Sequence, residues 1–434
     1  MSDRAARRRV ERPLSWAEPL AVAAGLAGRE GSLCLLSDPA IPASRSYVAA
    51  EPDQIRIGPA GADLFAAVRE PGFVEGVVGL AAYDAGARPA TGDRETVWPD
   101  LMLARYPALL VFDHDRRALK AVGWGADEAA AHAACDQAAA WLAEAREPGR
   151  PPAPAHRLTA EAPPQAYLDA VAEVVGRISA GELFQANIAR AWRGALRPGA
   201  DPFEVFLRLA TDRAAPYGAW WRLGERALVS NSPELFLVCD RAAGRIETRP
   251  IKGTRGRESD PVADAAAAAA LLASAKDRAE NLMIVDLMRN DLARVCTPGS
   301  VKVEALFAVE SHPTVHHLVS TVAGALAPGQ GPAEALTASF PPGSITGAPK
   351  HQAMKVIADL EPPRGPWCGT LFVLDEVGRL TASVLIRTAS FERVEGVWTF
   401  RALAGAGIVA DSVPAAELAE TEVKFSALRQ ALAG

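Results

Sequence analysis

Apolar residues recur along this chain with two periods, one typical of helices and one typical of strands. Just after residue 165, a stripe at helical spacing is followed by a glycine placed as a helix C-cap: Tyr167, Val171, Val174, Val175, Ile178 and Gly181. Further helices are expected at 127–145, 279–295, 349–360 and 415–433. Strands are expected at 77–81, 108–112, 183–192, 226–239, 369–374, 382–393 and 397–404. Because the strands come in runs rather than in strict alternation with helices, the pattern predicts an α+β fold with largely antiparallel sheets.

A proline-rich stretch at 148–164 interrupts this pattern. Its prolines exclude regular helix and sheet over most of its length; they are Pro148, Pro151, Pro152, Pro154, Pro163 and Pro164. We therefore expect an N-terminal region at 1–147, a crossover at 148–164 and a second region at 165–434. The residues with candidate chemistry all fall in the second region.

Composition narrows the class of protein. With 434 residues, 49% apolar and 23% charged, the chain has ample material for a globular core. A net charge of −6 gives no general attraction to nucleic acid or to an anionic membrane, and the longest uncharged apolar run, 265–275, is too short to cross a bilayer. The basic start lacks the apolar segment of a secretory signal. Five dispersed cysteines without a CxxC pair indicate reduced thiols, so a cytoplasmic location is expected.

Three motifs suggest a ligand but fit it poorly. Residues 405–410 match the GxGxxA dinucleotide pattern, yet Pro414 interrupts the following run and too little chain remains for a nucleotide-binding half. The segment 343–350, GSITGAPK, has the glycines and the lysine of a P-loop, but Pro349 breaks the required sequence. His312, His316 and His317 are clustered, but zinc binding by these histidines is disfavoured because no nearby pattern supplies a third ligand.

Lys252 and Glu234 stand in short apolar segments beside strand-like runs. Lys252 lies between Ile251 and Gly253, where partial desolvation would lower its pKa and make the amine a usable nucleophile. Glu234 follows a proline in the segment SPELF, where burial would raise its pKa and suit a general acid. Taken singly, each is more often an exposed charge.

Other polar residues could hold an anionic ligand. Glu280 and Glu420 lie on predicted helices, and two carboxylates would suit Mg²⁺ if the fold brings them together. The loop containing Ser344 runs into Pro349, so a helix N-terminus there could hold a carboxylate. Arg387, expected at the end of a strand, could clamp a second carboxylate.

Together these segments resemble the chorismate-utilising family, which includes anthranilate, aminodeoxychorismate, isochorismate and salicylate synthases. The resemblance spans about residues 165–425 and is carried by GELFQAN, SPELF, PIKGT, ENLMIVDLMRND, HHLVS, GSITGAPK, IRT, GAGIVAD and ETEVK, in that order. The N-terminal region resembles the family more weakly, through residues 35–37 and 79–84. The resemblance to the family implies a two-sheet α/β sandwich with helices between the sheets, to which both regions contribute.

Single positions separate the reactions within the family. Isochorismate and salicylate synthases use a lysine to activate water where this chain has Gln185, and anthranilate synthases typically read PIAGT where this chain reads PIKGT. The resemblance therefore implies component I of aminodeoxychorismate synthase, with anthranilate synthase component I as the alternative. A non-catalytic chorismate-binding protein is the alternative from another class.

The resemblance also implies a role for each residue. Lys252 would attack C2 of chorismate, Glu234 would assist loss of the C4 hydroxyl, and His317 matches a histidine near the pyruvate-releasing step of anthranilate synthases. Glu280 and Glu420 would hold Mg²⁺, with Asp277 behind them. The substrate-contacting positions would be Thr254, Ser344, Arg387, Gly405, Gly407 and Lys424.

The resemblance also bears on the source of ammonia and on a tryptophan pocket. The chain contains no GxCxG glutaminase nucleophile, so ammonia would come from a glutamine amidotransferase subunit. The resemblance leaves open whether Leu35, Leu36 and Ser37 line a tryptophan pocket, as in some relatives, or form only a strand.

Overall fold

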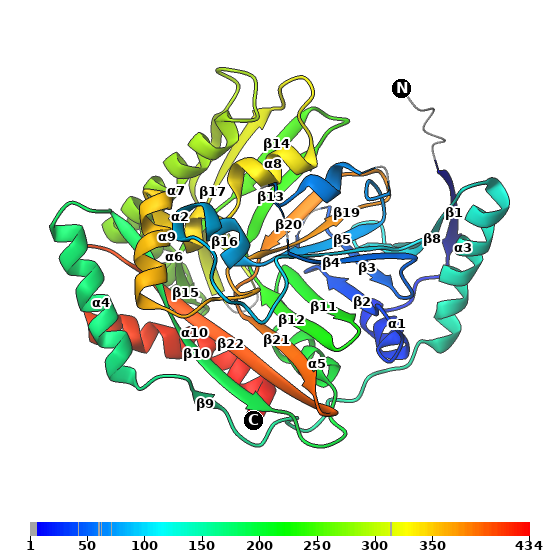
Figure 1. Ribbon diagram of the computed structural model, residues 1–434, viewed down its shortest axis with the longest axis horizontal. Helices are drawn as coiled ribbons and strands as arrows, with labels where there is room; N and C mark the ends of the chain where they lie inside the picture. The colour runs from blue at the N-terminus through cyan, green and yellow to red at the C-terminus, as the bar shows by residue number, and fades with distance from the viewer. Residues whose placement is uncertain (1–6, 42, 60, 62, 71, 313–314) are drawn as a thin grey trace.

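The chain is built on two large sheets, as the computed structural model shows for residues 7–41, 43–59, 61, 63–70, 72–312 and 315–434 (Figure 1). Every strand pairing between named strands in these residues is antiparallel. Helices pack around the sheets, so the α+β fold with antiparallel sheets that the sequence predicted is confirmed.

Within the described residues, the first sheet has twelve strands. In spatial order they are β1 (Arg8–Leu14), β8 (Ala118–Gly125), β7 (Ala108–Asp113), β3 (Arg45–Ala49), β2 (Leu33–Leu36), β11 (Tyr217–Leu223), β12 (Arg226–Ser232), β21 (Thr388–Val394), β22 (Val397–Ile408), β10 (Gln185–Ala195) and β18 (Gly347–Ala348), with β9 (Thr159–Ala160) paired to β10.

The second sheet has ten strands in the part of the chain that the structure describes. Their order is β15 (Ile251–Gly256), β17 (Val315–Ala325), β14 (Arg245–Arg249), β13 (Leu235–Asp240), β20 (Leu380–Val384), β19 (Thr370–Leu374), β5 (Val77–Ala81), β6 (Leu101–Arg105) and β4 (Gln54–Gly58), with β16 (Lys302–Ser311) paired to β17. Both sheets therefore contain strands from before the proline-rich stretch and strands from after it.

Helices lie around the two sheets and at both ends of the view in Figure 1. They are α1 (Pro19–Leu26), α2 (Tyr83–Thr91), α3 (Glu128–Ala140), α4 (Pro164–Ser179), α5 (Pro202–Arg213), α6 (Pro261–Ala273), α7 (Ala275–Ala293), α8 (Pro332–Ser339), α9 (Lys350–Leu360) and α10 (Pro414–Ala433), with 3-10 turns η1 (Ala66–Arg69), η2 (Trp141–Glu144) and η3 (Gly343–Ile345). Helices α6 and α7 pack on β15 and β17, while α10 packs on β22 and on α4.

Two of the predicted strands are wrong, because each region forms two strands that belong to different sheets. The predicted strand 226–239 divides at Pro233 and Glu234 into β12 of the first sheet and β13 of the second. The predicted strand 382–393 divides into β20 and β21 in the same way, and Arg387 lies in the segment between them. Two candidate site residues thus sit where the chain crosses from one sheet to the other.

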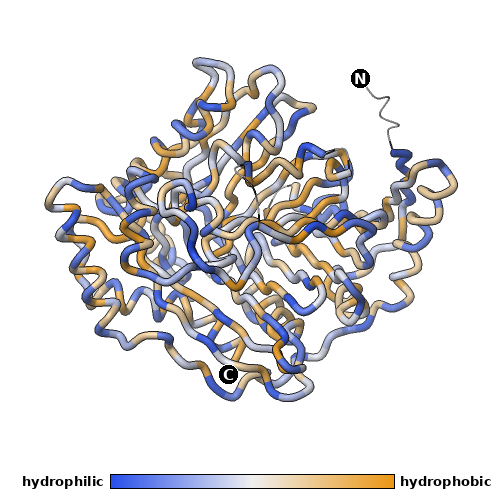
Figure 2. Tube along the Cα trace, viewed as in Figure 1, coloured by the Kyte–Doolittle hydropathy of each residue, from blue (hydrophilic) through white to orange (hydrophobic). Residues whose placement is uncertain are grey.

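Apolar residues fill the interior in two large buried clusters, and Figure 2 shows hydrophobic segments along the central strands. Beside β2, β3 and β11, the first sheet faces β13, β19 and β20 of the second across a cavity whose lining contains no helical residue among those described. At this point the sheets face each other without the intervening helices that the resemblance implied. Among the described residues, no helix is both long and apolar enough to cross a membrane.

Candidate active site

Lys252 lies on β15, with its amine directed at the first sheet. A Cβ built on Gly407 of β22 would lie 3.4 Å from Lys252 Nζ and 3.1 Å from Gln185 Nε2. Burial lowers the pKa of Lys252, while the nearby carboxylates of Glu280 and Glu234 oppose the shift. The amine is therefore desolvated, as a nucleophilic lysine requires, although two acids lie close enough to counteract part of the effect.

Glu234 lies at the crossing between β12 and β13 and is only 5% exposed. Burial raises the pKa of its carboxyl, and a hydrogen bond from Ser344 together with the charge of Lys252 works in the opposite direction. A carboxyl that holds its proton more tightly than usual suits a general acid. Ser344 and Lys252 thus lie close enough to Glu234 to influence its protonation.

Glu280 on α7 and Glu420 on α10 act on each other electrostatically and on Lys252. The pKa of Glu280 is raised, first by burial and then by the charges of Asp277 and Glu420. Burial would raise the pKa of Glu420 as well, but Lys424, whose Nζ is 2.6 Å from Glu420 Oε1, holds it below its usual value. Two carboxylates from different helices that lie within electrostatic reach of each other could hold Mg²⁺, which takes a few hard oxygen ligands and keeps waters.

Thr254 and His317 face each other across β15 and β17. Thr254 Oγ1 and His317 Nδ1 are 2.9 Å apart, and His317 is 2% exposed. Burial lowers the pKa of His317 to about 3, and the positive charge of Arg387 acts in the same direction. The imidazole is therefore neutral at physiological pH, and Arg387 lies within electrostatic reach of it.

Gly405, Gly407 and Lys424 occupy one part of the site. Both glycines lie inside β22, and Lys424 Nζ donates to the carbonyl oxygen of Gly405 over 3.0 Å. A side chain at Gly405 would collide with Asn187 Oδ1, at 2.7 Å, so the glycines leave room above the sheet. Because they lie within a strand, the GxGxxA pattern does not form the strand-to-helix turn of a dinucleotide site.

Gln185 and Asn187, two residues apart on β10, point to the same face of the sheet as these glycines. Both amide atoms of Gln185, as well as Asn187 Oδ1, are buried and make no hydrogen bond to any described residue. Buried polar atoms normally have partners, so these are expected to contact a bound ligand. Asn187 was not predicted as a site residue, although its alternation with apolar residues beside Gln185 was a usable signal.

As expected, the loop that contains Ser344 runs into a helix, α9, but Pro349 precedes α9 and is not its first residue. Ser344 lies in the 3-10 turn η3, and the short strand β18 separates it from α9, whose preceding residue is Pro349. The first residue of α9, Lys350, is itself paired with Asp291, with 2.6 Å between Nζ and Oδ2. Arg387 likewise does not end a strand but precedes β21, with a left-handed φ of 52°.

The histidines and Asp277 have partners within the protein. His316 Nε2 lies 3.0 Å from Asp264 Oδ1, and His316 Nδ1 lies 2.8 Å from Ser311 Oγ. Asp277 accepts a hydrogen bond from Arg255 over 3.0 Å. Among the described residues, no three His, Cys, Asp or Glu side chains group as a metal-binding cluster would require.

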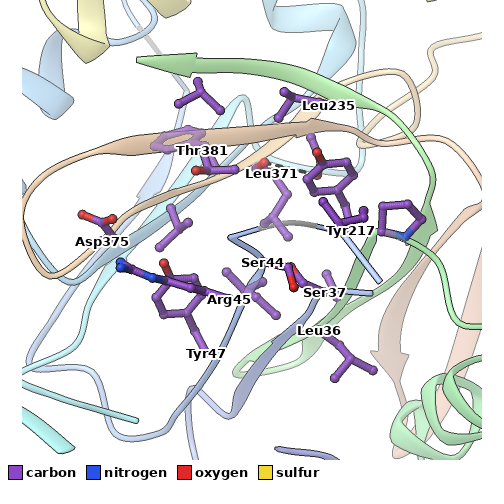
Figure 3. Close-up of a pocket in the computed structure, with 18 of the residues that line it drawn as sticks. Leu36, Ser37, Ser44, Arg45, Tyr47, Tyr217, Leu235, Leu371, Asp375 and Thr381 are labelled. Carbon is purple, nitrogen blue, oxygen red and sulfur yellow. Dashed lines mark hydrogen bonds between the residues drawn. The ribbon is translucent and has the colours of Figure 1, made fainter. Parts of the chain in front are cut away.

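Leu35, Leu36 and Ser37 line a separate cavity of about 220 Å³ between the two sheets (Figure 3). Figure 3 shows Arg45, Tyr47 and Asp375 at one end of it and Tyr217 with Leu36 at the other. None of the predicted site residues is among its described lining residues.

Comparison with known proteins agrees with this geometry. Residues 43–430 match the family described as chorismate binding enzyme. The chain is 40% identical to aminodeoxychorismate synthase component 1 of Salmonella typhimurium over 80% of this chain and 75% of the relative. It is 38% identical to anthranilate synthase component 1 of Thermus thermophilus over 83% of this chain and 78% of the relative. The crystal structure of anthranilate synthase component I from Streptococcus pneumoniae superposes with a TM-score of 0.76 at 25% identity, covering 91% of this chain and 94% of that one. The chain therefore belongs to the family of chorismate binding enzymes.

Proposed function

We propose that this protein is the component of aminodeoxychorismate synthase that converts chorismate and ammonia to 4-amino-4-deoxychorismate. The observation that carries the proposal is the desolvated amine of Lys252, held beside Gly407 and Gln185 and within the field of Glu234. Relatives with this name share about 40% identity with the chain, which supports the same assignment. The product would serve p-aminobenzoate and folate synthesis in the cytoplasm.

The proposed reaction proceeds in two displacements. Lys252 Nζ forms a bond to C2 of chorismate while the C4 hydroxyl departs, and Glu234 supplies the proton that makes the leaving group water. Ammonia then bonds to C4, the bond from C2 to Lys252 breaks, and a proton is lost from the new amine. Chorismate and ammonia are thus converted to the amino product and water.

The remaining residues bind and orient the substrate. Ser344 and Arg387 present a hydroxyl and a guanidinium suited to a carboxylate, and Thr254 orients the neutral ring of His317. Glu280 and Glu420 would hold Mg²⁺ with help from Asp277, and the ion would neutralise a substrate carboxylate when bound. Gly405 and Gly407 leave room for the ring, and Lys424 fixes the strand that carries them.

Ammonia is proposed to come from a separate glutamine amidotransferase subunit. The chain has no cysteine in a GxCxG setting, and all five of its cysteines are buried. Several relatives are named as component 1 of a synthase, which supports a partner for this chain as well.

The experiment that tests the function is product identification. The purified protein is incubated with chorismate, Mg²⁺ and ammonium, and the product is identified by mass. We expect 4-amino-4-deoxychorismate; anthranilate as the main product would instead support anthranilate synthase component I, which the Thermus relative and the presence of His317 favour. If no product forms and chorismate with Mg²⁺ leaves the melting temperature unchanged, both enzymatic assignments fail.

A further inference from the structure

A buried ion pair outside the candidate catalytic group touches several of the segments that form the site. Arg364 and Glu361 follow the end of α9, with 2.9 Å between Arg364 Nε and Glu361 Oε2, and the arginine side chain has no exposed surface. Removing two charges from water is costly, and a hydrophobic pair of similar volume is often at least as stable. The burial of this ion pair therefore indicates that it has a role beyond stability.

The guanidinium of Arg364 reaches two segments of the site at once. Arg364 Nη2 donates to the carbonyl oxygen of Asn187 over 2.6 Å, and Nη1 donates to that of Ile345 over 3.3 Å. Asn187 lies on the strand that presents Gln185, and Ile345 follows Ser344 in η3. A planar group with five donors in fixed directions is well suited to hold both carbonyls and a carboxylate together.

Glu361 completes the connection from its own side. Its Oε1 accepts a hydrogen bond from the backbone N–H of Ala189 over 2.6 Å, two residues beyond Asn187 on β10. The carboxylate thus holds both the strand and the arginine that holds the same strand. The guanidinium also lies over the rings of Trp367 and Tyr83, with centroid distances of 5.1 Å and 4.7 Å. Trp367 packs beside Gly405, since a Cβ there would lie 2.9 Å from its ring.

We propose that Arg364 and Glu361 are positioning residues that fix the strand bearing Gln185 and Asn187 against the turn bearing Ser344. They touch no group that reacts; they set the distance between two walls of the substrate site. The inference rests on the proposed function only for the identity of the substrate.

The test compares Arg364→Lys with Arg208→Lys. Arg208 on α5 is a matched control: it is 3% exposed and also donates to two backbone carbonyls, those of Pro151 and Gln430, away from the site. Lysine keeps the charge in both variants, but its three donors sit on a single atom and cannot span acceptors that lie as far apart as those of the guanidinium. For Arg364→Lys we expect a rise in the KM for chorismate and a loss of roughly 10²-fold in kcat/KM, with little change in the KM for ammonium. For Arg208→Lys we expect wild-type kinetics, whatever its melting temperature.

A second variant keeps the test decisive if Arg364→Lys fails to fold. Glu361→Gln keeps an acceptor for Ala189 but turns an amide toward the donors of Arg364, so we expect the KM for chorismate to rise by about tenfold. Wild-type KM and kcat in a folded Arg364→Lys or in Glu361→Gln would overturn the proposal, as would an equal loss in Arg208→Lys. Because consumption of chorismate is measured, the comparison stands even if the wild-type product is anthranilate and the proposed function fails.

Discussion

Lys252 and Gly407 face each other across the gap between the two sheets, with 3.4 Å between Lys252 Nζ and the place that a Cβ on Gly407 would occupy. The absence of a side chain at this position keeps the amine within reach of the space above β22. Four predictions follow from this and neighbouring contacts.

The first concerns the two glycines of β22. Gly407→Ala would place a methyl group 3.1 Å from Gln185 Nε2 and 3.4 Å from Lys252 Nζ, so the ends of these two side chains must shift slightly. We therefore expect a KM for chorismate raised at least about tenfold and a melting temperature near that of the wild type. Gly405→Ala would meet the backbone oxygen of Ile188 at 2.7 Å, so we expect a lower melting temperature. Thermal denaturation and steady-state kinetics on both variants check the contrast; equal loss of stability in both would contradict it.

The second concerns the amine itself. Lys252→Ala should lower product formation with ammonium by about 10³-fold or more, because the nucleophile is lost, while the circular dichroism spectrum stays unchanged. Lys355→Ala, at an exposed lysine of α9, serves as the control and should keep full activity. Retained activity in Lys252→Ala would show that no covalent bond to this residue is needed.

The third concerns the proposed acid. Glu234→Gln keeps the shape of the side chain but cannot release a proton, so we expect kcat to fall by about 10²–10⁴-fold with a small change in the KM for chorismate. Glu417→Gln is the matched control, because Glu417 is 4% exposed and also pairs with a hydroxyl, that of Ser412, over 2.7 Å. A parallel loss in both variants would indicate a structural role for Glu234.

The fourth concerns the pH dependence of stability. Burial lowers the pKa of His317 to about 3, against 6.5 for a free histidine, so below pH 6.5 the unfolded chain binds a proton that the folded chain refuses. The contribution of His317 to the free energy of unfolding is therefore fully present above pH 6.5 and is lost as the pH falls toward 3. Between pH 7.5 and pH 5.5, His317 should account for a loss of about 1.4 kcal/mol in the free energy of unfolding.

Urea denaturation of wild type and His317→Gln at both pH values measures this contribution. The variant should lose less stability than the wild type over the interval, by about that amount. His132→Gln, at an exposed position of α3, should follow the wild type. Identical pH dependence in wild type and His317→Gln would show that the imidazole is not held neutral.

Some of these features were open to prediction from the sequence and others were not. The helices α4, α9 and α10 carry strong signals in periodicity, prolines and length, so their existence was predicted within a few residues. The crossings at Glu234 and Arg387 were missed, because a chain that leaves one sheet for another stays extended and apolar on both sides. No local pattern records which sheet a strand joins.

The candidate site shows the same division. Lys252 and Glu234 were named from their motifs, but their proximity depends on β15 and the β12–β13 crossing, which meet only in the fold. Arg364 was not predicted as a site residue, since the sequence does not distinguish a buried arginine from an exposed one. Its importance appears only with its contacts to Asn187 and Ile345.

Both sheets combine strands from before the proline-rich stretch with strands from after it, so the protein cannot be cut there into two fragments that fold independently. In the first sheet β11 pairs with β2, and in the second β19 pairs with β5. A fragment that began after residue 147 would expose the backbone donors and acceptors of β11 and β19 as two bare edges, which recruit strands from other molecules. Such a fragment is expected to aggregate when expressed alone and to recover only when the missing residues are supplied with it.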